Sequence, residues 1–201
     1  MTPQRFINDI LKPWDELNTL LAKQYAFQPD LSDVSRLAGN IAVSIRHQVD
    51  FSELNDKQAN ELSPPHKLMS DAGDYWRHGN LRKEERNSTI SVSATFEYKD
   101  GPEFRFIRNT VMLEHQSLGK HDFMVVAAEA ARFWISQHGF NINWRGIPDA
   151  ELFVYEPAAR LKFNPKYCAS MSSVQLQFVK MDTSNKLVPF DPPDVKFEVY
   201  E

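Results

Sequence analysis

A stretch near the middle of the chain brings together residue types that could perform acid–base chemistry. Asp71, Asp74 and His78 follow one another at spacings of three and four residues, which would place them along one side of a helix. A carboxylate beside an imidazole can orient the ring and stabilise its protonated form, as general acid–base catalysis requires. Asp74 and His78 are therefore candidate catalytic residues. The alternative is a solvated helix end, where His78 would interact with the helix dipole.

Histidines and carboxylates also gather further along the chain, where they could hold a metal ion. Imidazole and carboxylate are both common zinc ligands. Together with Asp71, the residues His115 and His121 are candidate ligands, as in a metal-dependent hydrolase. Their spacing matches no zinc motif, and the neighbouring Asp122 is equally suited to cap a helix.

Basic and aromatic side chains are interleaved in two stretches, a pattern typical of proteins that grip single-stranded nucleic acid. The basic candidates are Arg77, Arg82, Lys83, Arg86, Arg105 and Arg108. The aromatic residues among them are Tyr75, Trp76, Phe104 and Phe106. Arginine contacts phosphates and aromatic rings stack on bases, so nucleic acid is a candidate partner. Glutamates at 84, 85 and 103 interrupt the basic run, and the competing interpretation is a charged, solvated turn.

The composition of the whole chain narrows these alternatives. The 201 residues are 42% hydrophobic and 25% charged, with a net charge of −4, which is typical of a folded globular protein. The acidic balance does not favour a dedicated nucleic-acid-binding protein, which usually has a basic excess. The sequence contains no glycine-rich phosphate-binding motif and only 7 glycines, so we expect no cofactor.

A single cysteine, Cys168, bears on redox chemistry. It cannot form an internal disulfide, so the fold does not depend on oxidation. It is interpreted either as a reactive nucleophile or as a small loop residue. The first residues lack the apolar run of a signal peptide, and no stretch of about 20 apolar residues suggests a membrane span. We therefore expect a cytoplasmic protein without a membrane partner.

The first part of the chain has the apolar periodicity of helices. Thr2 and Pro3 mark a helix start, and the run continues to Tyr25 with a break expected at Pro13. A second helix opens near Asp30. Its apolar stripe consists of Leu31, Val34, Leu37, Ala38, Ile41, Ile45 and Val49. A stripe of this width must pack against other elements.

A third helix is marked at both ends. Residues 51–62 are polar and are interpreted as a loop with a short helical turn. The sequence Ser63-Pro64-Pro65 then predicts an N-cap and a helix start. Gly79 fits the position just beyond a helix end.

After residue 86 the spacing of apolar residues changes from a helical period to strict alternation. Apolar and polar residues alternate from Ile90 to Tyr98, which predicts a half-buried strand. A turn around Gly101 and a returning strand over Glu103–His115 complete a hairpin. Asp122 then predicts the N-cap of a helix that reaches about His138.

Further short strands are expected around Leu152 and Val154, over 174–178 and over 195–199, paired antiparallel because each shows one solvated face. The sequence therefore predicts a single α+β domain spanning 1–201, with a helical part over 1–86 and a strand-rich part over 87–201. We expect N-terminal helices plus a mostly antiparallel sheet, with one helix packed on the apolar face of the sheet.

These patterns leave three functions open, and whether the protein is an enzyme stays undecided at this point. We favour a non-catalytic binding or assembly protein with a protein partner or self-association. The chain contains 14 Phe, 6 Tyr and 4 Trp. Aromatic side chains on half-exposed strands would suit such a role, because exposed aromatic patches and free strand edges commonly bind partners. The alternatives are a nucleic-acid-binding or nucleic-acid-processing protein that uses Asp74, Arg77, His78 and Arg82, and a metal-dependent hydrolase.

Overall fold

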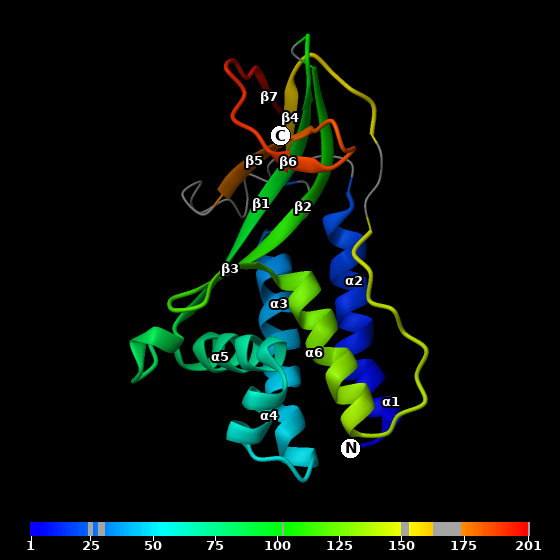
Figure 1. Cartoon of the computed structure of the whole chain (residues 1–201), viewed down its shortest axis with the longest axis vertical. Helices are drawn as coiled ribbons and strands as arrows, with labels where there is room; N and C mark the ends of the chain where they lie inside the picture. The colour runs from blue at the N-terminus through cyan, green and yellow to red at the C-terminus, as the bar shows by residue number, and fades with distance from the viewer. Residues whose placement is uncertain (24–25, 28–30, 102, 150–152, 163–173, 201) are drawn as a thin grey trace. The chain divides into compact units, whose positions relative to one another are not determined.

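The described part of the chain forms two compact units. The computed structural model describes residues 1–23, 26–27, 31–101, 103–149, 153–162 and 174–200, and Figure 1 shows the order of their elements. Unit 1 combines Met1–Asn18, Ser35–Ile90 and Val111–Pro148, and unit 2 combines Thr19–Val34, Ser91–Thr110 and Asp149–Glu201. That the chain folds as one domain stays a prediction.

The first helical run contains a π-helical segment. The elements are α1 (Pro3–Phe6), a π segment (Ile7–Leu11) and α2 (Lys12–Leu21). Thr2 caps α1 through its hydroxyl, which accepts a hydrogen bond from the N–H of Arg5 at 3.3 Å. The break expected at Pro13 takes the form of this π segment, because Pro13 has no N–H to donate to a carbonyl one turn back.

The second helix is followed by two short helical elements. These are α3 (Leu31–Arg46), a 3₁₀ segment (His47–Phe51) and α4 (Asp56–Leu62). Five of the expected stripe residues are buried: Val34, Leu37, Ala38, Ile41 and Ile45. The helix α4 is longer than the single turn expected for residues 51–62. Asn55 and Gln58 cap it reciprocally, each side chain accepting the other's N–H at 3.0 Å, a capping box that the sequence contained.

The helix α5 (Pro64–His78) begins and ends where the sequence predicted. The Ser63 hydroxyl accepts from the N–H of His66 at 3.1 Å, and Gly79 ends the helix with a φ of +70°. A Cβ on Gly73 would lie 2.9 Å from the carbonyl oxygen of Ala42 in α3. Glycine therefore allows α5 to pack directly on the backbone of α3.

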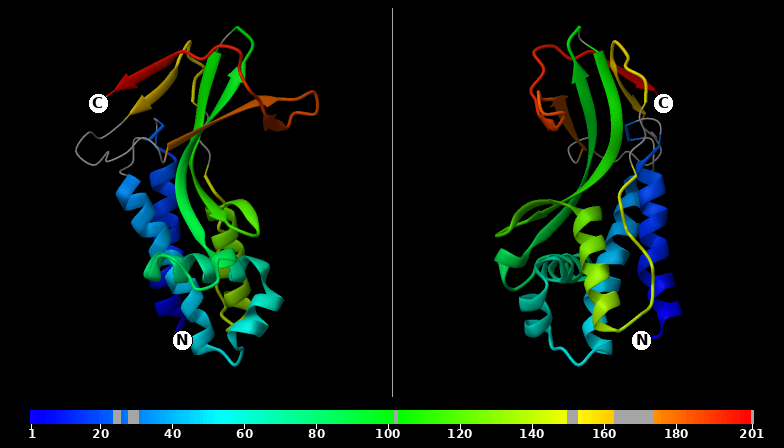
Figure 2. Two further views of the ribbon diagram at one scale, coloured as in Figure 1. Left: turned by 90° about the vertical axis from the view of Figure 1, so that its left-hand side faces the viewer. Right: turned by 45° about the vertical axis from the view of Figure 1, so that its right-hand side comes forward.

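The helix α6 (Phe123–Gln137) also begins at its predicted cap. Asp122 accepts from the N–H of Met124 at 2.8 Å. The helix packs against α5 and against β3, and its Trp134 is fully buried. Figure 2 shows α5 running across α6 in unit 1.

The strands form a mixed sheet of five and a separate pair. In the larger sheet the order is β3-β2-β1-β5-β6, and the pair is β4-β7. The strands are β1 (Ser88–Lys99), β2 (Glu103–His115), β3 (Gly119–Asp122), β4 (Ala159–Lys162), β5 (Val174–Met181), β6 (Leu187–Pro189) and β7 (Phe197–Tyr200). This arrangement confirms the α+β class, with a mostly antiparallel sheet and helices packed on it.

Two strand pairings differ from the expectation. Strand β5 pairs parallel with β1, with Phe96 opposite Phe178, and β7 pairs parallel with β4. Alternation in a sequence reports that one face of a strand is solvated, and it does not report the direction of the neighbouring strand. The strand expected around Val154 is also wrong at that residue, which is 75% exposed and lies in no strand. Leu152, Asp30 and Tyr25 lie outside the described residues.

None of the helices in the described part of the chain combines the length and the hydrophobicity needed to cross a membrane.

Candidate functional site

Five ionisable side chains of unit 1 meet in one partly buried group. They come from α3, α5, β2 and the 3₁₀ segment Glu84–Arg86, and we call them the Asp71 cluster: Arg46, Asp71, Asp74, Arg86 and His115. The side chains of Asp71 and His115 are each only 1% exposed. The candidate residues Asp71, Asp74, Arg86 and His115 thus lie together, although the sequence analysis had assigned them to three different hypotheses.

Each carboxylate in the Asp71 cluster has cationic or N–H partners on both oxygens. Asp71 accepts from Arg86 Nε at 2.6 Å on one oxygen and lies 3.0 Å from His115 Nε2 on the other. Asp74 accepts from Arg46 Nε and from Arg86 Nη2, both at 2.8 Å. A buried carboxylate is tolerated only when it is paired and hydrogen-bonded in this way.

The hydrogen bonds of His115 define its tautomer. Its Nδ1 accepts from the backbone N–H groups of Ser117 and Leu118, both at 3.2 Å. The ring proton therefore lies on Nε2, which donates it to Asp71. Because both ring nitrogens are engaged and the side chain is buried, this arrangement fixes the imidazole and presents no lone pair to a substrate.

The arginines also control the ionisation of the cluster. Burial alone would raise the pKa of Asp74, but the hydrogen bonds from Arg46 and Arg86 outweigh it and hold that pKa below its usual value. Burial alone would lower the pKa of Arg86, and its bonds to Asp71 and Asp74 raise it instead. Asp74 and Arg86 therefore stay ionised, which suits a structural clamp between α3, α5 and the segment that precedes β1.

The candidate catalytic pair is not joined. Asp74 points to Arg46 and Arg86, whereas His78 is exposed in the last turn of α5. Among the contacts of the described residues, none links Asp74 with His78. A four-residue spacing allows such a contact, but two arginines from elsewhere in the chain occupy this carboxylate. A catalytic role for Asp74 and His78 stays a prediction.

The three candidate metal ligands are only partly brought together. Asp71 meets His115, while Nε2 of His121 lies 3.0 Å from the backbone oxygen of Leu118. Within the described ranges, no group of three or more His, Cys, Asp or Glu side chains is arranged to hold a metal ion. Cys168, the other reactive candidate, lies outside the described residues.

The basic candidates fall into two groups. Arg77, Arg82 and Lys83 are exposed, and Arg77 Nη1 lies 2.9 Å from His47 Nε2. His47 in turn contacts Asp50 through Nδ1 at 2.7 Å. These three residues are the most exposed of the basic candidates.

The other basic candidates are held by contacts within the chain. Arg86 belongs to the Asp71 cluster. Arg108 is 8% exposed and donates to the backbone oxygens of Asn109 and Asp149, both at 3.1 Å. Arg105 donates through Nε to Glu97 at 3.0 Å. Such engagement reduces the number of cations that could meet phosphates.

Arg105 lines a hollow of about 390 Å³ in unit 2. Its guanidinium lies 4.7 Å from the ring centre of Tyr155, a cation–π contact. Burial and a hydrogen bond with Glu97 raise the pKa of the Tyr155 hydroxyl. Glu97 is itself 3% exposed. Arg105 and Glu97, which both line this hollow, therefore form an ion pair with each other.

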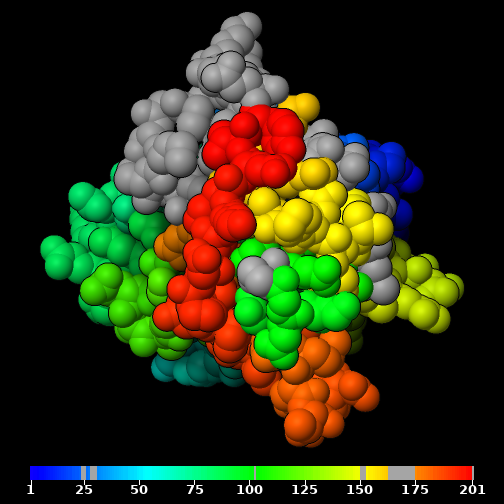
Figure 3. All heavy atoms as spheres, turned by 90° about the horizontal axis from the view of Figure 1, so that it is seen from above, coloured from blue at the N-terminus to red at the C-terminus, as the bar shows by residue number. Residues whose placement is uncertain are grey.

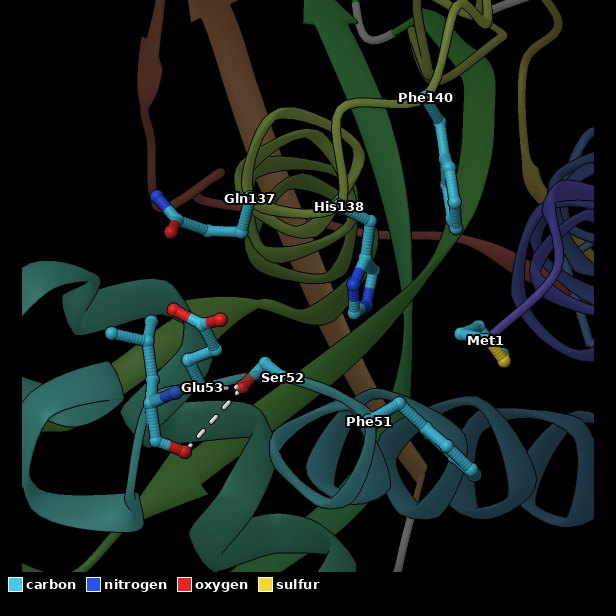
Figure 4. A pocket seen from close by; sticks show the side chains of 8 residues that line it. Met1, Phe51, Ser52, Glu53, Gln137, His138 and Phe140 are labelled. Carbon is cyan, nitrogen blue, oxygen red and sulfur yellow. Dashed lines mark hydrogen bonds between the residues drawn. The ribbon is translucent and has the colours of Figure 1, made fainter.

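A second hollow, of about 580 Å³, lies in unit 1. Figure 4 shows the side chains of His138 and Phe140, which follow the end of α6, across the hollow from the segment that carries Phe51 and Glu53. The His138 ring stacks on Phe140 with ring centres 5.0 Å apart. Its Nε2 lies 3.1 Å from the side-chain oxygen of Gln48, and burial lowers its pKa. The hollow offers aromatic walls and one carboxylate.

The β4-β7 pair of unit 2 carries an apolar face that is covered on one strand only. Ala159 pairs with Phe197 and Leu161 pairs with Val199, and paired residues of neighbouring strands point to the same side. On β4, Ala159 and Leu161 are 0% and 6% exposed. On β7, Phe197 and Val199 are 48% and 61% exposed. We call Phe197 and Val199 the β7 apolar row.

The opposite face of the β4-β7 pair is a polar network. Arg160 contacts Glu156 at 2.6 Å and donates to Glu198 at 3.2 Å. Glu198 also accepts from the Tyr200 hydroxyl at 2.7 Å, and these contacts lower the pKa of Glu198. Side chains therefore tie β7 to β4 on one face, while the other face of β7 is open.

Comparisons with known proteins add no relative. No protein-family model, curated protein or solved structure matches this chain.

The ion pair between Glu97 and Arg105 could have been predicted from the sequence but was not. Glu97 and Arg105 each lie four residues from Gly101, at the turn of the predicted hairpin. Counting outward from the turn also pairs Tyr98 with Phe104, whose ring centres are 5.6 Å apart. Opposite charges at such positions predict a cross-strand ion pair. Arg46 carried no comparable signal, because its contact with Asp74 depends on how α3 and α5 pack.

Proposed function

We propose that this chain is a non-catalytic assembly protein that associates with other copies of itself through β7. The observation that carries the proposal is the β7 apolar row. Phe197 and Val199 continue an apolar face that β4 buries, yet they are exposed. A sheet face that changes from covered to uncovered between two paired strands is typical of a surface that another chain completes.

The other sheet edges carry protective features that β7 lacks. Strand β6 ends at Pro189, and β3 contains Lys120. A proline or a lysine within an edge strand is a common device that prevents the edge from pairing with other chains. The outer side of β4 is bridged to Ala26. Strand β7 has the sequence Phe-Glu-Val-Tyr, without proline or lysine.

Strand β7 is firmly held to β4 although its apolar row is exposed. Arg160 and Tyr200 hold Glu198 on the polar face, and the backbone N–H of Ala159 donates to Lys196 at 2.8 Å. The strand is thus presented in an extended form, which reduces the entropy lost when a partner strand binds. Figure 3 shows the C-terminal segment, in red, lying open on the face that it draws.

The polar candidates support this preference over the enzymatic alternatives. The Asp71 cluster is neutralised internally, and both nitrogens of His115 are engaged. Four of the six basic candidates contact groups of the chain itself: Arg77, Arg86, Arg105 and Arg108. The polar candidates therefore have contacts within the chain, whereas the β7 apolar row is exposed and would gain most from contact with a partner.

Light scattering coupled to size-exclusion chromatography tests the proposal. A four-residue strand provides a small interface, so we expect weak, concentration-dependent association. The mean mass of the wild type should rise with loading concentration, and Val199→Asp should abolish the rise because it places a charge in the apolar row. Val154→Asp is the matched control, since Val154 is also exposed in unit 2 but lies in no strand. A wild-type mass that stays monomeric at millimolar loading would overturn the proposal.

A further inference from the structure

The backbone of β7 shows which of its polar groups are turned outward. The carbonyl of Lys196 accepts from Ala159, so the backbone groups of Lys196 face β4. The N–H and C=O groups of successive strand residues alternate between the two edges. Those of Phe197 and Val199 therefore point to the open edge, where they can pair with a further strand.

We infer, on the basis of the proposed self-association, that two copies pair β7 with β7 in an antiparallel manner, with the two-fold axis at Val199. Two identical strands in this orientation form a closed, isologous contact. Val199 and its copy exchange both backbone hydrogen bonds, and the result is a continuous four-stranded sheet of order β4-β7-β7-β4. The β7 apolar rows of both copies then lie on one face of that sheet.

The charge of Glu198 favours a two-fold axis at Val199 over one at Glu198. With the axis at Val199, Glu198 lies opposite Tyr200 of the second copy, whose hydroxyl can donate to it in place of the Glu198 of its own chain. With the axis at Glu198, the two Glu198 carboxylates would face each other, and like charges directly opposite are destabilising. In the first register Arg160 remains on the same face as Glu198 and keeps its contact with it.

Cysteine cross-linking reads the register directly. Because Cys168 is the one cysteine of the chain, the variants Phe197→Cys, Glu198→Cys and Val199→Cys are made in a Cys168→Ser background. In the inferred dimer the two residues at 199 have Cα atoms about 5.5 Å apart, within disulfide range. The two residues at 197 are roughly 13 Å apart, since each residue advances about 3.3 Å along a strand.

We expect mild oxidation to convert the Val199→Cys protein to a covalent dimer on a non-reducing gel, and to leave the Phe197→Cys protein monomeric. More efficient cross-linking of Glu198→Cys than of Val199→Cys would overturn the register. If no β7 cysteine cross-links while Val199→Asp still abolishes association in light scattering, antiparallel β7 pairing is wrong and self-association stands. If the wild type does not associate at all, the proposed function fails together with this geometry.

A charge variant gives a second, independent readout. Glu198→Gln removes the carboxylate without changing the shape of the side chain. In the inferred register it loses a favourable contact with Tyr200 of the second copy, so the dissociation constant should stay the same or rise. A dissociation constant that falls severalfold would instead show that two Glu198 carboxylates oppose each other, and would overturn the position of the axis.

Discussion

Unit 1 and unit 2 place opposite kinds of side chain in unusual environments. In unit 1, Asp71 and His115 are ionisable groups with side chains 1% exposed. In unit 2, Phe197 and Val199 are apolar groups that are 48% and 61% exposed. The buried groups of unit 1 have hydrogen-bond partners within the chain. The exposed groups of unit 2 have no comparable cover among the described residues, although β4 buries its half of the same face.

This difference separates groups whose partners lie within the chain from groups that remain exposed to solvent. Burying an ion is unfavourable unless it is paired and hydrogen-bonded, and both oxygens of Asp71 and of Asp74 have such partners. Exposing an apolar row is unfavourable, and under the proposed self-association a second copy would cover it. Substitutions in unit 1 should therefore change the stability of the monomer, and substitutions in β7 should change association.

The largest expected effect is at Asp71. Asp71→Ala leaves His115 and Arg86 without their shared acceptor, and breaking a buried ion pair by removing one partner costs about 3–5 kcal/mol. The midpoint of urea unfolding should fall accordingly. Glu61→Ala is the control, since Glu61 and Lys57 form an exposed pair at 3.9 Å of the kind that contributes less than about 1 kcal/mol. Equal effects of the two variants would contradict the clamp.

The next effect is a pH dependence that originates at His66. This side chain is fully buried, and burial lowers its pKa to about 4 from 6.5. Its Nδ1 accepts from Trp134 at 3.1 Å, which keeps the ring neutral. The unfolded chain binds the proton more readily between pH 6.5 and 4, so stability is fully present above pH 6.5 and falls as the pH drops toward 4. The loss amounts to about 3 kcal/mol.

Denaturant unfolding measured from pH 7.5 to 4 checks this dependence. His66→Gln keeps an acceptor for Trp134 but cannot titrate, so the fall in its free energy of unfolding should be smaller than that of the wild type. Parallel profiles for the two proteins would show that another group is responsible.

Two glycines sharpen the account of packing in unit 1. A Cβ on Gly73 would meet the backbone of Ala42 at 2.9 Å, and a Cβ on Gly39 would meet the indole of Trp76. Backbone cannot yield, so we expect Gly73→Ala to lower stability by about 1–3 kcal/mol. Trp76 is 43% exposed and can swing outward, so Gly39→Ala should change stability less and red-shift tryptophan fluorescence. The reverse ranking would contradict the tight contact of α5 with α3.

The smallest effect on monomer stability is expected in β7. Val199→Asp should change the free energy of unfolding, measured at low protein concentration, by less than about 1 kcal/mol, because the side chain is exposed. The same change should abolish association. A loss of several kcal/mol would show that Val199 belongs to the core of unit 2, which would remove the contrast between the units.

Local signals in the sequence predicted most of the elements. Ser63 and Gly79 marked the ends of α5, Asp122 marked the start of α6, and the turn at Gly101 marked the hairpin, because caps and turns act over a few residues. The parallel pairing of β5 with β1 was not predictable in this way. It joins residues about 80 positions apart, and the alternating pattern is the same for either strand direction.

For the candidate site, too, local residue types were predictable from the sequence and tertiary contacts were not. The sequence identified Asp71, Asp74, Arg86 and His115 as unusual, but it assigned them to catalysis, metal binding and nucleic-acid binding instead of to one cluster. Only tertiary packing brings β2 beside α5. The exposure of Phe197 and Val199 was hidden for the same reason, since an alternating strand does not reveal whether its apolar face is covered.

Amide hydrogen exchange at Phe197 and Val199, measured at low and high protein concentration, tests the central claim most directly. Their N–H groups point to the open edge of β7, and in the proposed assembly that of Val199 would be hydrogen-bonded to the second strand. We predict that exchange at Val199 slows as the concentration rises, while exchange at the exposed residue Val154 does not change. Exchange at Val199 that is equally fast at both concentrations would contradict assembly through β7.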